Sequence, residues 1–133
     1  MGTSVAEELR RDLACEDLLE CVHGLTDLDR TCFRTVAKAQ DPLTVDEIAE
    51  RVDRERSTAY RSVHRLLDAG FLEKDQVNYD HGGYYHVYRP VDPDEVAEDM
   101  AELIDRWHAK MTDLVTEFRE EYGEQIPTDP MPD

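Results

Sequence analysis

Apolar residues recur at steps of three and four positions along most of the chain, which is the spacing of one buried face of a helix. This pattern predicts a helix over residues 5–24, a second helix that begins at Thr26 or Asp27, a third over 45–52 and a fourth over 57–69. Each has one apolar stripe and an otherwise polar surface, so the helices are expected to pack around a modest core.

Residues that favour helix ends lie where these stripes begin and stop. Gly24 and Gly70 follow the first and fourth helices, and glycine readily adopts the left-handed conformation that ends a helix. Thr44, with Glu47 three residues later, matches a capping box at the start of the third helix. Ser57 is expected to cap the fourth helix. The third and fourth helices are then joined by a short turn.

After the fourth helix the pattern changes to short runs rich in aromatic and β-branched residues. The segments FLEK and YYHVYRPV predict a β-hairpin over residues 71–90, with the sequence DHGG at its tip. Helices followed by such a hairpin predict a mainly α fold with a β-hairpin wing, in which residues 1–92 form one winged helix-turn-helix domain.

A heptad repeat of apolar residues predicts a long last helix over residues 93–123. Its seam, which is too apolar to be left in water, contains Ala97 and six further residues: Met100, Ile104, Trp107, Met111, Leu114 and Phe118. These six are expected to form a dimerisation surface, so we expect a homodimer. The alternative is that the Met and Trp side chains line a ligand pocket. Residues 124–133 are Pro-rich and acidic, and are expected to be disordered.

The charge of the chain is strongly negative, with 32 acidic residues, only three lysines and a net charge of -17. This balance resembles that of haloarchaeal proteins, whose surfaces work in molar salt, where charges are screened within about 3 Å. A disordered acidic chain is the alternative, but the hydrophobic periodicity argues against it. The sequence shows no signal peptide and no membrane span, so a cytoplasmic protein with no membrane partner is expected.

Three cysteines, Cys15, Cys21 and Cys32, form no CxxC pair, which argues against a disulfide framework or a zinc site. Cys32 lies within an apolar stripe and is expected to be inert core. On one continuous helix, Cys15 and Cys21 would be separated by about 9 Å of rise, too far for a disulfide. Cys21 is the candidate for a redox-sensing thiol, although packing is the simpler role.

The segment LTVDEIAERVDRERSTAYRSVHRLLDAGFLEK resembles the winged helix-turn-helix of archaeal TrmB-type regulators, which are related to the MarR and ArsR groups. The resemblance covers about residues 26–90. It implies that residues 57–69 form the recognition helix of a DNA-binding protein. Larger TrmB proteins carry a sugar-binding domain after the wing. Because this chain has a single long helix there, a sugar effector does not carry over.

The predicted recognition helix has a polar face suited to DNA. Its buried stripe leaves Ser57, Thr58, Arg61 and Arg65 on the opposite side. Arg61 can form two hydrogen bonds with guanine in the major groove, and Thr58 can contact a base edge or a thymine methyl group. The helix N-terminus, with Ser57 as its cap, suits a phosphate.

Other side chains are better placed to hold the DNA backbone, which positions a protein without specifying sequence. They are Arg54, Arg56, Tyr60 and Arg65. His81, at the tip of the hairpin, is a candidate for a minor-groove contact. Residues 51–65 have a local charge of about +3, whereas residues 91–133 hold 14 acidic and three basic residues. Segregation of this kind favours one binding face on an acidic body.

The sequence therefore predicts a sequence-specific transcriptional regulator of a halophilic archaeon, with a redox response as a further hypothesis. Its partners would be double-stranded DNA with a roughly palindromic operator, and a second copy of the chain. No cofactor or metal is expected, and the sequence does not identify a small-molecule effector. A metal site among the five histidines and a hydrolase built from Ser57, His64 and Asp68 are disfavoured, so no enzyme is expected. The alternative is a winged-helix protein-interaction module that does not bind DNA.

Overall fold

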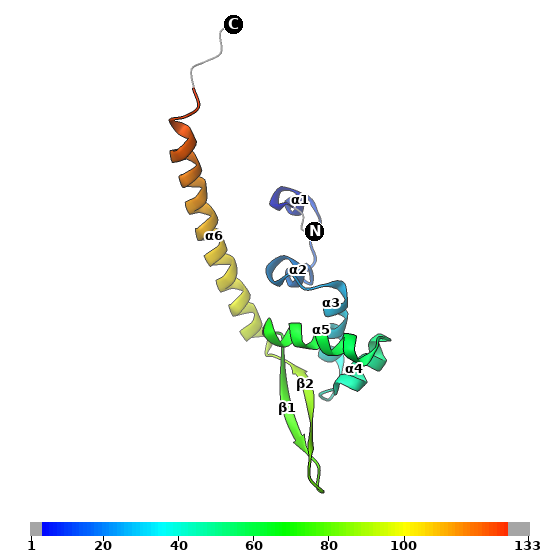
Figure 1. Cartoon of the computed structure of the whole chain (residues 1–133). Helices are drawn as coiled ribbons and strands as arrows, with labels where there is room; N and C mark the ends of the chain where they lie inside the picture. Colours follow the sequence, from blue (N-terminus) through cyan, green and yellow to red (C-terminus); the bar gives the residue numbers. More distant parts are fainter. Residues whose placement is uncertain (1–3, 128–133) are drawn as a thin grey trace. The chain divides into compact units, whose positions relative to one another are not determined.

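A computed structural model describes residues 4–127, and these form two compact units that divide between Val96 and Ala97. Figure 1 shows the order of the elements: six helices, with a two-stranded hairpin between α5 and α6 among the described residues. The division lies inside the last helix rather than at residue 92. No helix in the described part of the chain is both long and apolar enough to cross a membrane.

The N-terminal segment forms two short helices, α1 (Val5–Arg10) and α2 (Asp17–His23), and the predicted single helix over residues 5–24 is therefore wrong. Arg11 adopts an extended conformation after α1, and the Asp17 carboxylate accepts a hydrogen bond from the backbone N–H of Ala14, at 2.8 Å. No residue of α1 is buried. The apolar face of α2 therefore does not continue into α1 as one buried surface. Because the chain is not helical at Cys15, the predicted helical separation of Cys15 and Cys21 does not apply.

Three helices form the centre of the first unit: α3 (Asp27–Lys38), α4 (Val45–Val52) and α5 (Arg56–Asp68). The predicted capping box of Thr44 and Glu47 is confirmed at α4. A second capping box, of Thr26 and Asp29, begins α3. Helix α5 begins one residue earlier than predicted, after Glu55, so Ser57 lies inside the first turn and is not its cap.

The wing is an antiparallel hairpin of β1 (Leu72–Asn78) and β2 (Tyr84–Pro90), as predicted. Gly82 and Gly83, with φ values of 96° and 84°, supply the left-handed conformations of its tip. Leu43 forms two backbone hydrogen bonds with Tyr88, of 3.0 and 2.7 Å. These bonds attach the segment before α4 to β2 and hold the base of the wing against the helices.

The core of the first unit joins the helices to the base of the wing. Its largest fully buried apolar side chains come from α3, α4, α5 and the start of the hairpin: Val36, Ile48, Val63, Leu66 and Phe71. Cys32 is fully buried among them, which confirms its expected place in the core. The predicted stripes of the three helices therefore face one another, and the opposite side of α5 remains free.

The last helix, α6 (Pro93–Gly123), runs over the predicted residues. Only Val96, near its start, is buried. The heptad seam is exposed, with Trp107 51% and Phe118 65% accessible to solvent. Met100 and Met111 are half-buried. Of the predicted tail, residues 124–127 form a turn and its end. The remainder of that predicted disordered segment lies outside the described residues.

Candidate nucleic-acid interface

Helix α5 has one face in the core and one face in solvent. Ala59, Ser62, Val63 and Leu66 are buried. On the other side Ser57, Tyr60 and Arg61 are exposed and Thr58 is half-buried. The ring of Tyr60 packs on that of His64 one turn later, with centroids 4.2 Å apart.

The arginines predicted to contact DNA have different surroundings. Within residues 4–127, Arg61 makes no ion pair or hydrogen bond through its side chain. Arg54 donates only to the backbone carbonyl of Asp53, at 3.3 Å. Arg56 pairs with Asp46 of α4, with 2.8 Å between Nε and Oδ1, and both side chains are well exposed. An exposed pair of this kind is weak and can open for another partner.

Arg65 binds a buried partner, although 44% of its own side chain remains exposed. Its Nε and Nη2 atoms donate to the carboxylate of Asp29, at 2.8 to 3.1 Å, and Asp29 has no exposed surface. Ser62 donates to the same carboxylate at 2.5 Å, and the backbone N–H of Thr26 donates at 3.0 Å. This contact fixes α5 on α3, so the first role of Arg65 is structural. Sequence reasoning missed it because partners that lie 36 residues apart follow no local pattern.

The hydrogen bonds also decide the charge of Asp29. Burial alone would raise the pKa of this carboxyl group, but hydrogen bonds from Arg65, Ser62 and Thr26 outweigh burial and lower the pKa below its usual value. The carboxylate is therefore ionised at neutral pH, and the Arg65 guanidinium neutralises it.

The wing is aromatic rather than basic. His81 is exposed at the tip and stacks on Tyr79, with centroids 5.3 Å apart. Arg89 of β2 pairs with Glu73 at 2.9 Å and with Asp75, both on β1. A wing contact with DNA would therefore depend on rings and hydrogen bonds more than on charge.

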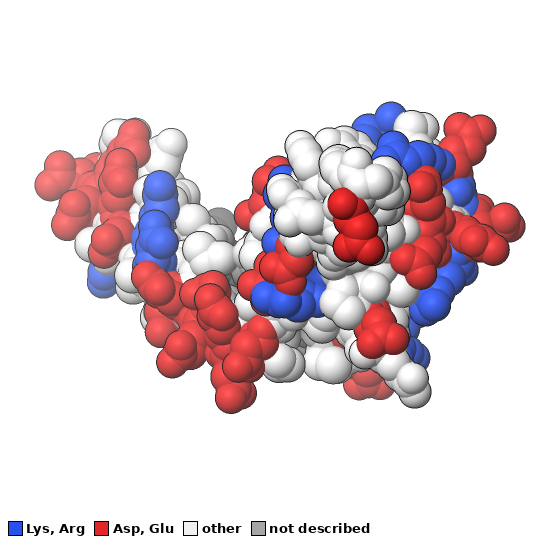
Figure 2. All heavy atoms as spheres, turned by 90° about the horizontal axis from the view of Figure 1, so that it is seen from below, with Lys and Arg blue, Asp and Glu red and all other residues white. Residues whose placement is uncertain are grey.

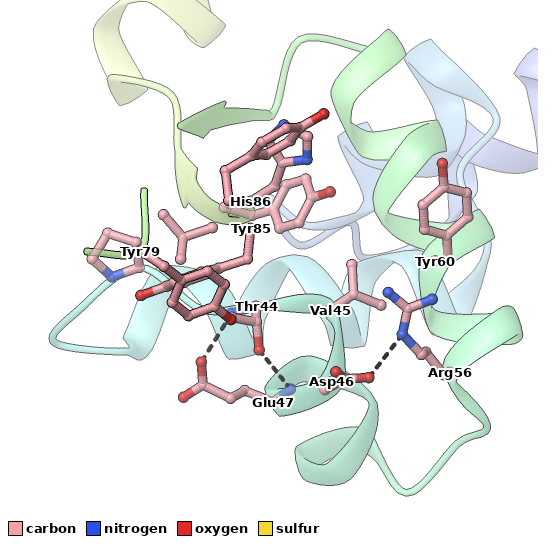
Figure 3. Close-up of a pocket in the computed structure, with 13 residues that line it drawn as sticks. Thr44, Val45, Asp46, Glu47, Arg56, Tyr60, Tyr79, Tyr85 and His86 are labelled. Carbon is pink, nitrogen blue, oxygen red and sulfur yellow. Dashed lines mark hydrogen bonds and ion pairs between the residues drawn. The ribbon is translucent and has the colours of Figure 1, made fainter. Parts of the chain in front are cut away.

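An open groove, which the sequence did not indicate, separates the wing from α4 and the start of α5 (Figure 3). Tyr60 lies on one side of it, and Tyr79, Tyr85 and His86 lie on the other, with Val45 between them. The concentration of tyrosines in YYHVYRPV was a signal in the sequence for one wall of the groove. The opposite wall could not be predicted, because it depends on how α4 and α5 pack together.

Seen from the end of the wing, the first unit shows acidic and basic side chains interspersed with uncharged surface, and an acidic side chain lies near its middle (Figure 2). The basic groups do not merge into one continuous patch on this face. This arrangement limits how many phosphates the face could neutralise together.

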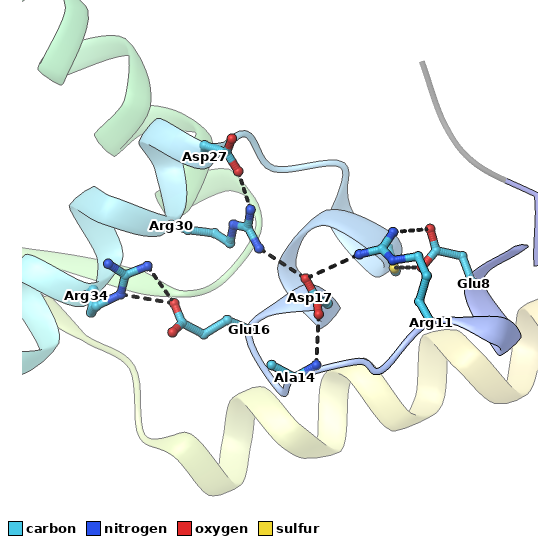
Figure 4. Close-up of polar contacts among 9 residues, drawn as sticks. Glu8, Arg11, Ala14, Glu16, Asp17, Asp27, Arg30 and Arg34 are labelled. Atoms are coloured by element: carbon cyan, nitrogen blue, oxygen red, sulfur yellow. Dashed lines mark hydrogen bonds and ion pairs between the residues drawn. The ribbon is translucent and has the colours of Figure 1, made fainter.

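Ion pairs join the start of α2 to α3 (Figure 4). Arg30 of α3 pairs with Asp17 of α2, at 3.2 Å, and with Asp27. The sulfur of Cys21 lies 3.8 Å from Oε2 of Glu8. Burial and nearby carboxylates, Glu8 first among them, raise the pKa of the Cys21 thiol. This is the opposite of what activates a redox-sensing cysteine.

The described residues contain no cluster of three or more His, Cys, Asp or Glu side chains that could hold a metal ion.

The three packed helices α3, α4 and α5, of which α4 and α5 form a helix-turn-helix, are followed by a two-stranded wing. This arrangement defines a winged helix-turn-helix protein.

Comparisons with known proteins agree with this class. The family model described as "Sugar-specific transcriptional regulator TrmB" matches residues 19–94. The uncharacterized protein MJ1503 of Methanocaldococcus jannaschii is 33% identical over 116 residues, which cover 84% of this chain and 87% of that protein. The chain belongs to the TrmB family of transcriptional regulators. Members of this family are regulators, which confirms the prediction that the chain is not an enzyme.

Two solved structures show the same fold. A possible transcriptional regulator from Methanosarcina mazei Go1 has a TM-score of 0.69 and 23% identity, over 80% of this chain and 94% of that one. TrmBL2, described as an archaeal chromatin protein with a novel mode of DNA binding, has a TM-score of 0.59 and 22% identity. That match covers 86% of this chain and 43% of TrmBL2.

Proposed function

We propose that this protein regulates transcription by binding specific sequences of double-stranded DNA, with α5 in the major groove. The observation that carries the proposal is Arg61: it is exposed on the free face of α5 and has no partner within residues 4–127. A guanidinium that is not already paired can form two hydrogen bonds with a guanine without first breaking an internal contact.

The surroundings of each side chain support a division of roles. Arg61 and Thr58 would read bases, and Ser57 would contact a phosphate near the start of α5. Arg54, Tyr60 and Arg56 would hold the DNA backbone, and Arg56 would exchange Asp46 for a phosphate. Arg65 would act mainly by holding α5 against α3, because two of its nitrogen atoms already bind Asp29. His81 would approach the minor groove.

The exposed seam of α6 supports a homodimer. Trp107, Leu114 and Phe118 are each at least 46% exposed in the single chain, and a second copy would cover them. The six proposed residues of this surface are Met100, Ile104, Trp107, Met111, Leu114 and Phe118. A two-fold dimer would bind a roughly palindromic operator with half-sites about one helical turn apart.

The acidic surface supports action at high salt, as in a halophilic archaeon. In molar salt the gain from releasing counterions on phosphate contact is small, so base contacts and apolar burial would contribute more of the affinity. A redox response through Cys21 has less support, because the carboxylates around the thiol disfavour the thiolate. Cytoplasmic location follows from the proposed role.

Genome-wide immunoprecipitation followed by footprinting on the recovered fragments would test the proposal. We expect protected sites that share a two-part sequence with half-site centres about 10 base pairs apart, measured in molar KCl. Random recovery and no protected sequence would contradict DNA recognition. In that case, a protein co-purified in stoichiometric amount would favour the interaction-module alternative.

A further inference from the structure

The groove between the wing and the helices has the size of a small-molecule site. Its volume is about 670 Å³. Ligand pockets in proteins are commonly about 300–1,000 Å³. Its walls come from three places in the chain: the segment that leads into α4 and its first turn, the first turns of α5, and the hairpin, where Tyr79 of the turn joins strand β2. It therefore exists only when the wing is seated on the helix-turn-helix.

Aromatic rings line a large part of the groove. Five of the chain's six tyrosines line it, together with His86: Tyr60, Tyr79, Tyr84, Tyr85 and Tyr88. The rings of Tyr79 and Tyr85 lie 5.0 Å apart and are tilted toward each other by 43°. The face of a tyrosine ring carries negative electrostatic potential and attracts cations within about 6 Å of its centre.

The charged groups of the groove also favour a cation over an anion. Asp46 and Glu47, in the first turn of α4, contribute two carboxylates, whereas Arg56 contributes the one guanidinium among the lining residues. Arg56 is already paired with Asp46, and Glu47 accepts the backbone N–H of Thr44 in the capping box while keeping its negative charge. An anion in this groove would meet an excess of negative charge, and a cation would be attracted.

We propose that the groove binds a small organic cation, with an alkylated ammonium group against the tyrosine rings and near the carboxylates of α4. Because Arg56 and Tyr60 line the groove and are also assigned to the DNA backbone, an occupied groove would weaken DNA binding. This second part depends on the proposed function, whereas binding of the cation itself does not. The protein would thus have an effector of defined chemistry at its DNA-binding face.

Choline is a suitable probe for the cationic head, and 3,3-dimethylbutan-1-ol is its uncharged analogue of nearly the same shape. Binding to the full-length, DNA-free protein would be followed by the NMR shifts of the tyrosine ring protons. Choline chloride would replace KCl at constant ionic strength, so that screening does not change during the titration. We expect saturable shifts of the groove tyrosines with choline and markedly weaker binding of the neutral analogue.

Variants separate the contribution of the rings from that of charge. Tyr85→Leu is expected to weaken choline binding about two- to thirtyfold, whereas Tyr85→Phe, which keeps the ring, should bind nearly as the wild type does. Asp46→Asn should also weaken binding. Glu50→Gln is its matched control, because Glu50 is exposed on the same helix and does not line the groove.

Equal affinity for choline and its neutral analogue would overturn the proposal, as would equal effects of Tyr85→Leu and Tyr85→Phe. A parallel titration of an operator fragment by fluorescence anisotropy tests the link to DNA: choline should weaken binding to the wild type and not to Tyr85→Leu. If the protein binds no DNA at all, the proposed function fails. The NMR titration still decides whether the groove is a cation site.

Discussion

The arginines of α5 differ in the contacts that they already make, and under the proposed function this difference decides which of them is available to DNA. Arg61 has no side-chain partner within residues 4–127, Arg56 is in an exposed ion pair, and Arg65 is bound to a buried carboxylate. The sequence predicted a base contact for Arg61 and backbone contacts for Arg56 and Arg65, but it could not show which of them already has a partner in the protein. Their contacts rank Arg61 first for reading bases and Arg65 last.

Arg61→Ala should weaken operator binding by about 1–3 kcal/mol and relax specificity at one base-pair position. The free energy of unfolding should be unchanged, because the side chain makes no internal contact that the structure describes. Fluorescence anisotropy on a set of single-base operator variants in molar KCl would measure both effects. Arg10→Ala, which removes an exposed arginine from α1, is the control for net charge. An Arg61→Ala protein with wild-type affinity and base preference would contradict this role.

Asp29→Asn should lower the free energy of unfolding by about 1.5–3 kcal/mol, because the buried carboxylate loses its charged hydrogen bonds to Arg65. Urea denaturation at neutral pH, followed by circular dichroism, would measure the difference.

The difference in unfolding free energy between the wild type and Asp29→Asn is expected to depend on pH. The folded pKa of Asp29 is lowered, because hydrogen bonds outweigh burial, so the unfolded chain binds the proton more readily. The stabilisation by Asp29 is thus fully present above about pH 5 and is lost as the pH falls below about 4 toward the folded pKa. A difference between Asp29→Asn and wild type that stays constant down to pH 3 would exclude this explanation.

Cys21 should react slowly with alkylating agents for an exposed thiol, because its surroundings raise its pKa and thiolate is the reactive form. Iodoacetamide labelling at pH 8, resolved by mass spectrometry, would compare Cys21 with the exposed Cys15. Glu8→Gln should speed the labelling of Cys21. Fast labelling of Cys21, together with loss of operator binding under mild peroxide that Cys21→Ser prevents, would instead support the redox hypothesis.

At the scale of elements, local signals predicted α3, α4 and the wing well. The capping box at Thr44, the helical stripes and the aromatic strands each depend on residues close in sequence. The prediction of one helix was wrong for residues 5–24, where the chain leaves the helical conformation after α1 and no residue of α1 is buried. The helical wall of the groove and the Asp29–Arg65 contact could not be predicted from the sequence, because both depend on how separate helices pack together.

Trp107→Glu should convert a dimer into a monomer, because it places a charge in the middle of the apolar seam of α6. Light scattering on the full-length protein at constant salt would give the mass, and circular dichroism would show that the helices remain. Ala109→Glu introduces the same charge at an exposed position two residues away, outside the seam, and should leave the mass unchanged. Equal masses for the wild type and Trp107→Glu would refute the assignment of this surface.

At the scale of the whole molecule, a net charge of -17 on 133 residues produces repulsion that the fold must overcome. Raising KCl from low concentration to 1 M should increase the melting temperature by about 5–10 °C, with most of the rise at the lower concentrations, where screening changes fastest. Differential scanning calorimetry would measure this rise. Sucrose at the same osmolality serves as the control, since it does not screen charge. A melting temperature independent of KCl would contradict adaptation to high salt.

Asp29 links the start of α3 to α5 in a way that bears on the motions of both helices. One carboxylate holds the first turn of α3, through the N–H of Thr26, and also holds α5, through Ser62 and Arg65. Fraying at the start of α3 and detachment of α5 are therefore a single cooperative opening event rather than two. The hydrogen-exchange rate of the Thr26 amide, which lies outside α5, would report how often α5 detaches from α3.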